Sequence, residues 1–163
     1  MTISVGDKLP DVMLVKMGED GPEGISVSTL TEGRTVAIFA VPGAFTPTCH
    51  SAHVPSFIRT KDEFLESGVD EIICLSVNDP FVLGSWGEVT GATDAEIAMI
   101  GDPSAEFTKA IGMDFTAPPA GLINRSKRYA MLVMDGEVKI LHEEKSPGEC
   151  EISAGEALLD AME

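Results

Sequence analysis

A buried strand that runs into a helix through a proline-rich turn limits the folds open to this chain. Residues 35–41, TVAIFAV, are an uninterrupted apolar run with several β-branched side chains, which predicts a strand covered on both faces. The next segment, PGAFTPT, contains two prolines and a glycine and predicts a turn. Residues 48–65 then predict a helix that Pro55 kinks and Gly68 ends.

Strands and helices go on alternating along the chain. We expect further strands at residues 12–17, 71–77 and 97–100, and helices at residues 80–89, 104–111 and 153–162. Ser153 would cap the last helix. Residues 112–124 predict an irregular connection, and residues 128–142 predict a hairpin that turns at Asp135-Gly136.

Helices between strands imply parallel pairing, whereas the hairpin adds antiparallel pairing. We therefore expect an α/β, thioredoxin-like fold with a mixed central sheet and helices on both faces. Because the sequence shows no repeat, linker or low-complexity segment, a single domain would span residues 1–163.

The charge balance argues against two classes of partner. Lys plus Arg number 11 and Asp plus Glu number 27, so the formal net charge is −16. Nucleic acids and anionic membrane surfaces bind cationic faces, and we expect neither as a partner. The sequence has no apolar run of about 18 residues for a membrane helix and no export signal at its start. Together with an odd number of cysteines, this predicts a reducing compartment, the cytoplasm.

Cys49 follows the proline-rich turn and falls in the first turn of the predicted helix. Free backbone N–H groups and the helix dipole at that end favour an anion, so a thiol there ionises more readily and becomes a nucleophile. Thr46, three residues earlier, can cap the helix and face the sulfur, and Pro42 can shield the sulfur from water. The plainer interpretation is a small buried cysteine beside an ordinary cap residue. Position alone leaves both interpretations open.

Two histidines suggest other chemistry. Cys49 and His53 are four residues apart and share a helix face, as a metal half-site or a nucleophile–base pair would. A structural zinc site needs about four ligands. The remaining soft donors are distant in sequence: Cys74, His142 and Cys150. We therefore expect no metal and no cofactor, and hydrogen-bonded packing roles for His50 and His53.

The run from Pro42 to Cys49, PGAFTPTC, resembles the Pro-x-x-x-Thr-x-x-Cys signature of peroxiredoxins. The longer segment VPGAFTPTC, with HVPSF after it, resembles the type II, peroxiredoxin five-like (atypical two-cysteine) subfamily. Similar stretches cover nearly the whole chain: VGDKLPDV, ICLSVNDPFVLGSW, KRYAMLVMDGEVK and the acidic C-terminal helix.

This resemblance implies an antioxidant enzyme, a thiol-dependent peroxidase that reduces hydrogen peroxide and alkyl hydroperoxides. Cys49 would be the peroxidatic cysteine, whose sulfur takes one peroxide oxygen and becomes a sulfenic acid. Thr46 and Arg128 would stabilise the reacting groups, and Pro42 would limit solvent access. Arg125 lies near Arg128 in the sequence but fits the family pattern less well.

The resemblance leaves three ways to reduce the sulfenic acid, in the following order of preference. Cys150 lies in the polar segment SPGECEIS, near the place of the C-terminal resolving cysteine in animal members, although Glu149 and Glu151 should disfavour its thiolate. A separate thiol (glutathione with glutaredoxin, or thioredoxin) is second, since no glutaredoxin domain follows before Glu163. Cys74, inside the apolar run IICLSV, is third because a buried thiol is inert.

Members of this subfamily are often homodimers. Exposed aromatic side chains at Phe45, Phe81 and Trp86 would suit such an interface, and a place in the core is the alternative for all three.

A thioredoxin-like redox sensor or binding protein, oxidised at Cys49 without useful turnover, is the competing function. A sensor does not need all of Pro42, Thr46, Cys49 and Arg128, so the full set favours the enzyme. A hydrolase that uses Cys49 and His53 is a more distant alternative, because no third, orienting group is evident.

Overall fold

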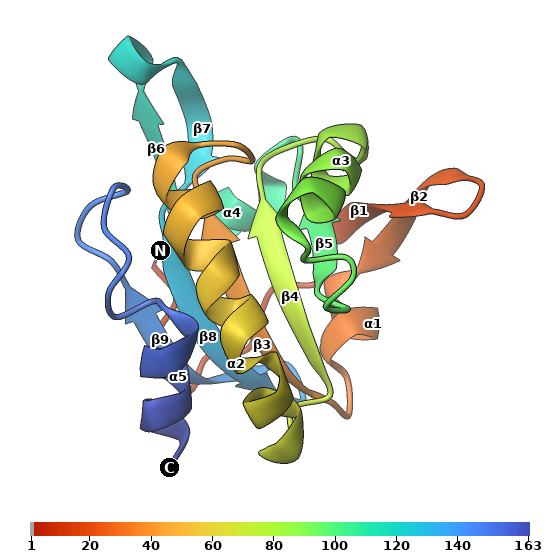
Figure 1. Cartoon of the computed structure of the whole chain (residues 1–163), viewed down its shortest axis with the longest axis vertical. Coiled ribbons are helices and arrows are strands. Elements are labelled where there is room, and N and C mark those ends of the chain that lie inside the picture. Colours follow the sequence, from red (N-terminus) through yellow and green to blue (C-terminus); the bar gives the residue numbers. More distant parts are fainter. Residues whose placement is uncertain (1) are drawn as a thin grey trace.

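The structure, a computed structural model, describes residues 2–163, so Met1, the first residue of the expected domain, lies outside it. A mixed sheet forms the centre, and helices cover both of its faces (Figure 1). In chain order the strands are β1 (Met13–Gly18), β2 (Gly21–Ser26), β3 (Thr35–Val41), β4 (Glu71–Ser76), β5 (Ala98–Gly101), β6 (Asp114–Ala117), β7 (Leu122–Ser126), β8 (Tyr129–Met134) and β9 (Glu137–Glu143). The helices are α1 (Val27–Thr31), the π-helix η1 (Cys49–His53), α2 (Val54–Glu66), α3 (Pro80–Thr90), α4 (Glu106–Ala110), the 3₁₀ helix η2 (Pro118–Ala120) and α5 (Gly155–Met162).

The seven strands of the main sheet in the described part of the chain lie in the order β2-β1-β5-β4-β3-β8-β9. Strand β3 pairs in parallel with β4, and β4 in parallel with β5. Strands β8 and β9 extend the sheet antiparallel on one side, and β1 and β2 on the other. The expected mixed sheet of an α/β, thioredoxin-like fold is therefore confirmed.

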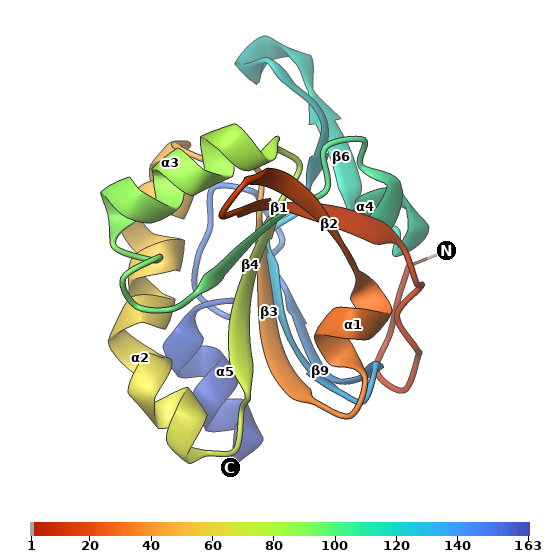
Figure 2. The same cartoon turned by 90° about the vertical axis from the view of Figure 1, so that its right-hand side faces the viewer.

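Strand β3 divides the interior into two cores because consecutive side chains point to opposite faces. Ala37, Phe39 and Val41 pack on one face, and the residues between them, such as Val36 and Ile38, pack on the other. Helices α2, α3 and α5 cover the first face, and α1 and α4 cover the second (Figure 2). Burial on both faces explains why the sequence of β3 is apolar without interruption.

The predicted helix over residues 48–65 forms in two parts. It starts as the π-helix η1, in which the N–H of Val54 donates to the carbonyl of Cys49, five residues back. Pro55 lies in the first turn of α2, where its missing N–H costs least. Gly68 ends the helix as expected: its φ of 97° is left-handed, and Val69 N–H donates to the carbonyl of Phe64.

The hairpin of β8 and β9 turns at Asp135 and Gly136, as predicted. Both residues have positive φ, 50° and 79°, which is the conformation that favours an Asp-Gly pair in a two-residue turn.

Residues 112–124, expected to be irregular, instead contain β6, η2 and part of β7, so that expectation is wrong. Among the residues that the structure describes, strands β6 and β7 pair only with each other, and they project beyond the body of the protein (Figure 1). Much of the hairpin is exposed, and its sequence therefore lacks the apolar alternation by which buried strands are recognised. The sequence also did not predict the short helix α1 or strand β2. Strand β2 is exposed or half-buried throughout and so lacks an apolar pattern as well.

The predicted cap of the last helix is also wrong. Helix α5 begins at Gly155 with no side-chain cap, and the hydroxyl of Ser153 donates instead to the carboxylate of Glu144. The N–H of Gly155 donates to the hydroxyl of Ser56 on α2. A Cβ at position 155 would overlap backbone atoms of Ser56, so glycine lets α5 lie directly against α2.

Candidate active site

Cys49 is the first residue of η1, at the end of the turn that leads out of β3. Its side chain is fully buried, on the face of the sheet that α2, α3 and α5 cover. The turn itself is constrained, because Phe45 has a φ of 65°, a left-handed conformation that is unusual outside glycine.

Two side chains donate to the sulfur of Cys49. The hydroxyl of Thr46 lies 2.8 Å from Sγ, and Nη2 of Arg128 lies 3.0 Å from it. The structure thus brings Arg128 to Thr46 and Cys49, although Arg128 lies 79 residues after Cys49 in the sequence. Thr46 makes no capping bond to a backbone N–H in the described residues, so the expected cap is replaced by the contact with sulfur.

The hydroxyl of Thr46 has a second partner, the carbonyl of Gly43 at 2.7 Å. A hydroxyl carries one proton. It donates to Gly43 when it accepts from a Cys49 thiol, and it donates to sulfur when Cys49 is a thiolate. Thr46 is therefore able to satisfy both protonation states of Cys49 without moving.

Arg128 lies just before β8 and is only 2% exposed. Its Nε and Nη2 donate to the carbonyl of Pro147 at 3.1 and 3.0 Å. Nη1 lies 2.8 Å from Nδ1 of His53. These contacts hold the plane of the guanidinium group so that Nη2 points at the sulfur.

His53 is fully buried and holds Arg128 in place. Since guanidinium only donates, Nδ1 of His53 accepts from Arg128, and Nε2 donates to the carbonyl of Ser153 at 2.9 Å. Burial, and then the charge of Arg128, lower the pKa of His53 to about 3. Both ring nitrogens are occupied, which leaves none to act as a base toward Cys49.

Pro42 and Arg125 form the wall of the turn. Pro42 is buried, and its carbonyl accepts from Nη1 of Arg125 at 3.2 Å. A Cβ at Gly43 would overlap that same guanidinium group. Arg125 therefore supports the backbone of the turn, whereas Arg128 contacts the sulfur.

Comparison with known proteins agrees with this geometry. Residues 4–159 match the Redoxin family. The chain belongs to that family, as a peroxiredoxin. It is 46% identical to peroxiredoxin-2E-2, chloroplastic, of Oryza sativa subsp. japonica, over 99% of this chain and 73% of the relative. It is 42% identical to peroxiredoxin-2B of Arabidopsis thaliana, over 98% of each chain.

Solved structures give the same answer. Reduced Prx3 of Vibrio vulnificus in complex with H₂O₂ superimposes with a TM-score of 0.93 at 42% identity, covering 99% of this chain and 100% of that one. Peroxiredoxin 5 of Alvinella pompejana superimposes with a TM-score of 0.86 at 32% identity, covering 98% and 97%. This peroxiredoxin is thus a thiol peroxidase, an oxidoreductase, and the alternative of a sensor without turnover is not favoured.

Cys150 lies half-buried in the irregular segment 145–152 of this peroxiredoxin. Burial is the main cause that raises the pKa of its thiol; the charge of Arg128 acts in the opposite direction, and the carboxylate of Glu144 adds to the rise. We expected the charges of Glu149 and Glu151 to disfavour the thiolate, but these two residues are not among the causes that shift the pKa of Cys150.

Cys74 is fully buried on β4, in the same apolar core as Cys49. Burial raises the pKa of its thiol well above the usual value. This is the environment of an inert thiol.

The three aromatic residues named as a possible interface differ in exposure. Phe45 is 49% and Phe81 65% exposed, whereas Trp86 is fully buried and donates through Nε1 to Nδ1 of His50. Trp86 therefore belongs to the core, and of these three residues Phe45 and Phe81 are the ones that present apolar surface.

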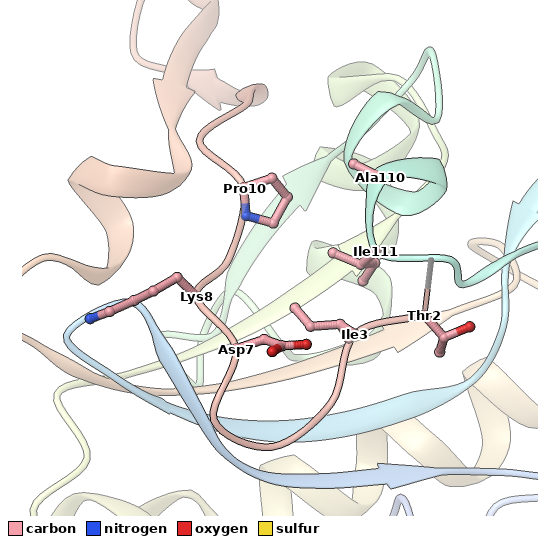
Figure 3. A pocket seen from close by; sticks show the side chains of 7 residues that line it. All are labelled: Thr2, Ile3, Asp7, Lys8, Pro10, Ala110 and Ile111. Atoms are coloured by element: carbon pink, nitrogen blue, oxygen red, sulfur yellow. The ribbon is translucent and has the colours of Figure 1, made fainter.

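Other features of this peroxiredoxin lie away from the sulfur. A cavity of about 330 Å³ beside the N-terminal segment is lined by residues that include the buried Ile3 and Ile111 and the exposed Asp7 and Lys8 (Figure 3). It lies on the α1 and α4 side of the sheet, opposite Cys49. Within residues 2–163 no His, Cys, Asp and Glu side chains form a metal-binding group of three or more. No helix in that range is long and apolar enough to span a membrane.

Proposed function

We propose that Cys49 is the peroxidatic residue of this peroxiredoxin. Its thiolate attacks one oxygen of a hydroperoxide, the O–O bond breaks, and the other oxygen leaves with a proton as water or an alcohol. The observation that carries this proposal is the pair of donors, Thr46 and Arg128, that converge on one buried sulfur. Hydrogen peroxide and alkyl hydroperoxides are the proposed substrates, which the H₂O₂ complex of the Vibrio vulnificus relative supports.

Each neighbour of Cys49 has a proposed role in this step. Arg128 and Thr46 stabilise the thiolate and then the negative charge that develops on the departing oxygen, because donors fixed in advance lower the barrier most. Pro42 limits the access of water to the sulfur. His53 is a positioning residue, since it acts only through Arg128.

Three routes for reducing the sulfenic acid are proposed in order of preference. Cys150 is first: its segment lies over Arg128, and the charges of Arg128 and Cys49 both act on its pKa. An external thiol, glutathione with glutaredoxin or thioredoxin, is second. Cys74 is third, because its burial opposes the thiolate.

Peroxide consumption with dithiothreitol as the reductant tests the role of Cys49. We expect Cys49→Ser to abolish the catalysed rate, and Cys74→Ser to retain it as the matched control. Equal rates in wild type and Cys49→Ser would remove the proposal.

Mass spectrometry of the peroxide-treated protein tests the resolving route. A disulfide between Cys49 and Cys150 is expected in wild type, and a sulfenic acid at Cys49 in Cys150→Ser. An intramolecular disulfide that persists in Cys150→Ser would give the role to Cys74.

We further propose a homodimer in the cytoplasm. Exposed Phe45 and Phe81 support an apolar contact with a second copy, and the three free thiols support a reducing compartment. Sedimentation of the reduced wild-type protein is expected to show a dimer. Sedimentation of the Phe81→Glu variant is expected to show a monomer. A monomer in wild type would contradict the assembly.

A further inference from the structure

Segment 145–152, which carries Cys150, is held to the rest of the protein by polar contacts. It contains no regular secondary structure, and its larger apolar residues, Pro147 and Ile152, are exposed. Buried apolar surface therefore contributes little to keeping it in place. Individual hydrogen bonds decide its position instead.

Three of these bonds tie the middle of the segment to the active site. The carbonyl of Pro147 accepts from Nε and Nη2 of Arg128, and the carbonyl of Gly148 accepts from the hydroxyl of Thr48 at 3.0 Å. The arginine that contacts the sulfur thus also holds the segment that carries the second thiol.

Glu144 closes the base of the segment. Its Oε2 accepts three hydrogen bonds: from the N–H of Glu151 at 2.7 Å, from the N–H of Ser153 at 2.8 Å and from the hydroxyl of Ser153 at 2.6 Å. The carboxylate is almost fully buried, and the N–H of Glu144 donates to the carbonyl of Arg128. Oε2 of Glu144, the residue just before the segment, therefore fixes the backbone at the segment's C-terminal end, at Glu151 and Ser153.

There is room for the segment to move. A cavity of about 170 Å³ lies beside it, bordered by Phe115, Lys127, Glu144 and Pro147. A segment held by a few polar contacts next to open space is the kind of element that opens locally while the core stays folded.

We propose that Glu144 is a positioning residue that holds segment 145–152 closed over Arg128, and that release of this hold is the step that frees Cys150 to reach Cys49. The functional part of this inference rests on the proposed role of Cys150. In the reaction itself, the Cys150 sulfur attacks the sulfur of the Cys49 sulfenic acid and the S–O bond breaks. The hydroxide leaves as water with the proton of the Cys150 thiol, and a disulfide forms.

Alkylation of the reduced, full-length protein with iodoacetamide tests the hold. In Glu144→Ala we expect alkylation of Cys150 to be at least about tenfold faster, because tenfold corresponds to losing roughly one hydrogen bond to a charged group and the variant loses three. Cys74 serves as the internal control, because it is buried in the core away from the segment. Acceleration at both thiols would mean general loosening and would overturn a specific hold.

Two further variants separate the hold from simple electrostatics, because the negative charge of Glu144 also acts on the thiol of Cys150. Glu144→Gln loses the charge but keeps an acceptor oxygen, and is expected to react nearly like wild type. Glu143→Ala removes the neighbouring carboxylate, which accepts no bond from the segment, and is expected to change nothing. If Cys150 is alkylated as fast in Glu144→Gln as in Glu144→Ala, the proposal is overturned.

Hydrogen exchange gives a readout that does not involve the thiol. The amides of Glu151 and Ser153 should exchange about tenfold faster in Glu144→Ala, since each loses its acceptor, and amides of β3 and β4 should not change. Unchanged exchange at 151 and 153 would refute the hold whether or not Cys150 is the resolving residue. A missing Cys49–Cys150 disulfide with accelerated exchange would instead count against the proposed resolving route alone.

Discussion

Nη1 of Arg128 donates to Nδ1 of His53 across 2.8 Å, inside the protein and 75 residues apart in the sequence. The bond needs a neutral ring, because a protonated imidazole has no acceptor. Together with the Pro147 carbonyl, this histidine fixes the position of the guanidinium group beside Cys49.

Replacing His53 should slow the enzyme without removing a group that touches the sulfur. In His53→Ala, Arg128 loses one of its supports but keeps Pro147, so we expect the rate of Cys49 oxidation to fall about tenfold, as small misplacements of catalytic groups do. His53→Asn supplies an oxygen acceptor near the place of Nδ1 and should recover part of the rate. Stopped-flow measurement of Trp86 fluorescence on mixing with peroxide follows this step, and no rescue by asparagine would contradict the positioning role.

His53 should also make the fold sensitive to mild acid. Its pKa is about 3 in the folded protein and 6.5 ordinarily, so the unfolded chain takes up a proton below pH 6.5 that the folded chain refuses. The free energy of unfolding should therefore fall by about 1.4 kcal/mol per pH unit well below pH 6.5. Between pH 7 and pH 5 this amounts to about 2 kcal/mol.

Urea unfolding of wild type and His53→Asn at pH 7, 6 and 5 checks this difference. His50 and His142 are present in both proteins, so they cancel in the comparison. Identical pH dependence in the two proteins would show that His53 titrates normally.

Replacing Arg128 should slow the reaction with peroxide far more than replacing Lys127, the cationic residue next to it in the sequence. Removing one fixed donor from a site of developing negative charge costs about 10² to 10³ in rate, and we expect that loss for Arg128→Ala in the second-order rate constant for peroxide. Lys127→Ala is the matched control, because Lys127 makes no contact with the sulfur, and its rate should stay within about twofold of wild type. Comparable losses in both variants would point to general attraction of the substrate and not to a directed hydrogen bond.

Gly155 should be needed for the contact between α5 and α2. A Cβ there would overlap the backbone of Ser56, so Gly155→Ala should lower the free energy of unfolding by about 1–3 kcal/mol. Gly84→Ala is the control: in α3 the new Cβ meets only Met17 at an ordinary 3.7 Å, and alanine should stabilise that helix by up to about 1 kcal/mol. Thermal or urea unfolding distinguishes the two, and an unaffected Gly155→Ala would mean that α5 shifts freely.

The sequence predicted elements that are buried or that turn tightly. Strand β3 is recognisable because both of its faces are covered, and the Asp135-Gly136 turn because its backbone needs positive φ at both positions. Strand β2 and the β6–β7 hairpin were missed because their exposed residues carry no apolar pattern. The sequence could predict that Thr46 faces Cys49 because the two residues are only three positions apart.

Contacts between residues that are distant in the sequence could not be predicted from the sequence without a family pattern. The four-residue spacing of Cys49 and His53 hinted at a shared face, but nothing in it pointed to Arg128 as the partner of the histidine. The role of the Glu144 carboxylate depends on the path of an irregular segment, which no periodicity describes. The Pro147 carbonyl is a backbone group and leaves no trace in residue type at all.

Complete enclosure of the Cys49 sulfur also bears on selectivity. Because Cys49 is fully buried, we expect an oxidant to reach the sulfur only when it is narrow or when the residues around Pro42 move apart. We expect bulkier electrophiles to be excluded by their size, whatever their chemical reactivity. Selectivity among oxidants would then depend first on their size and only afterwards on their reactivity.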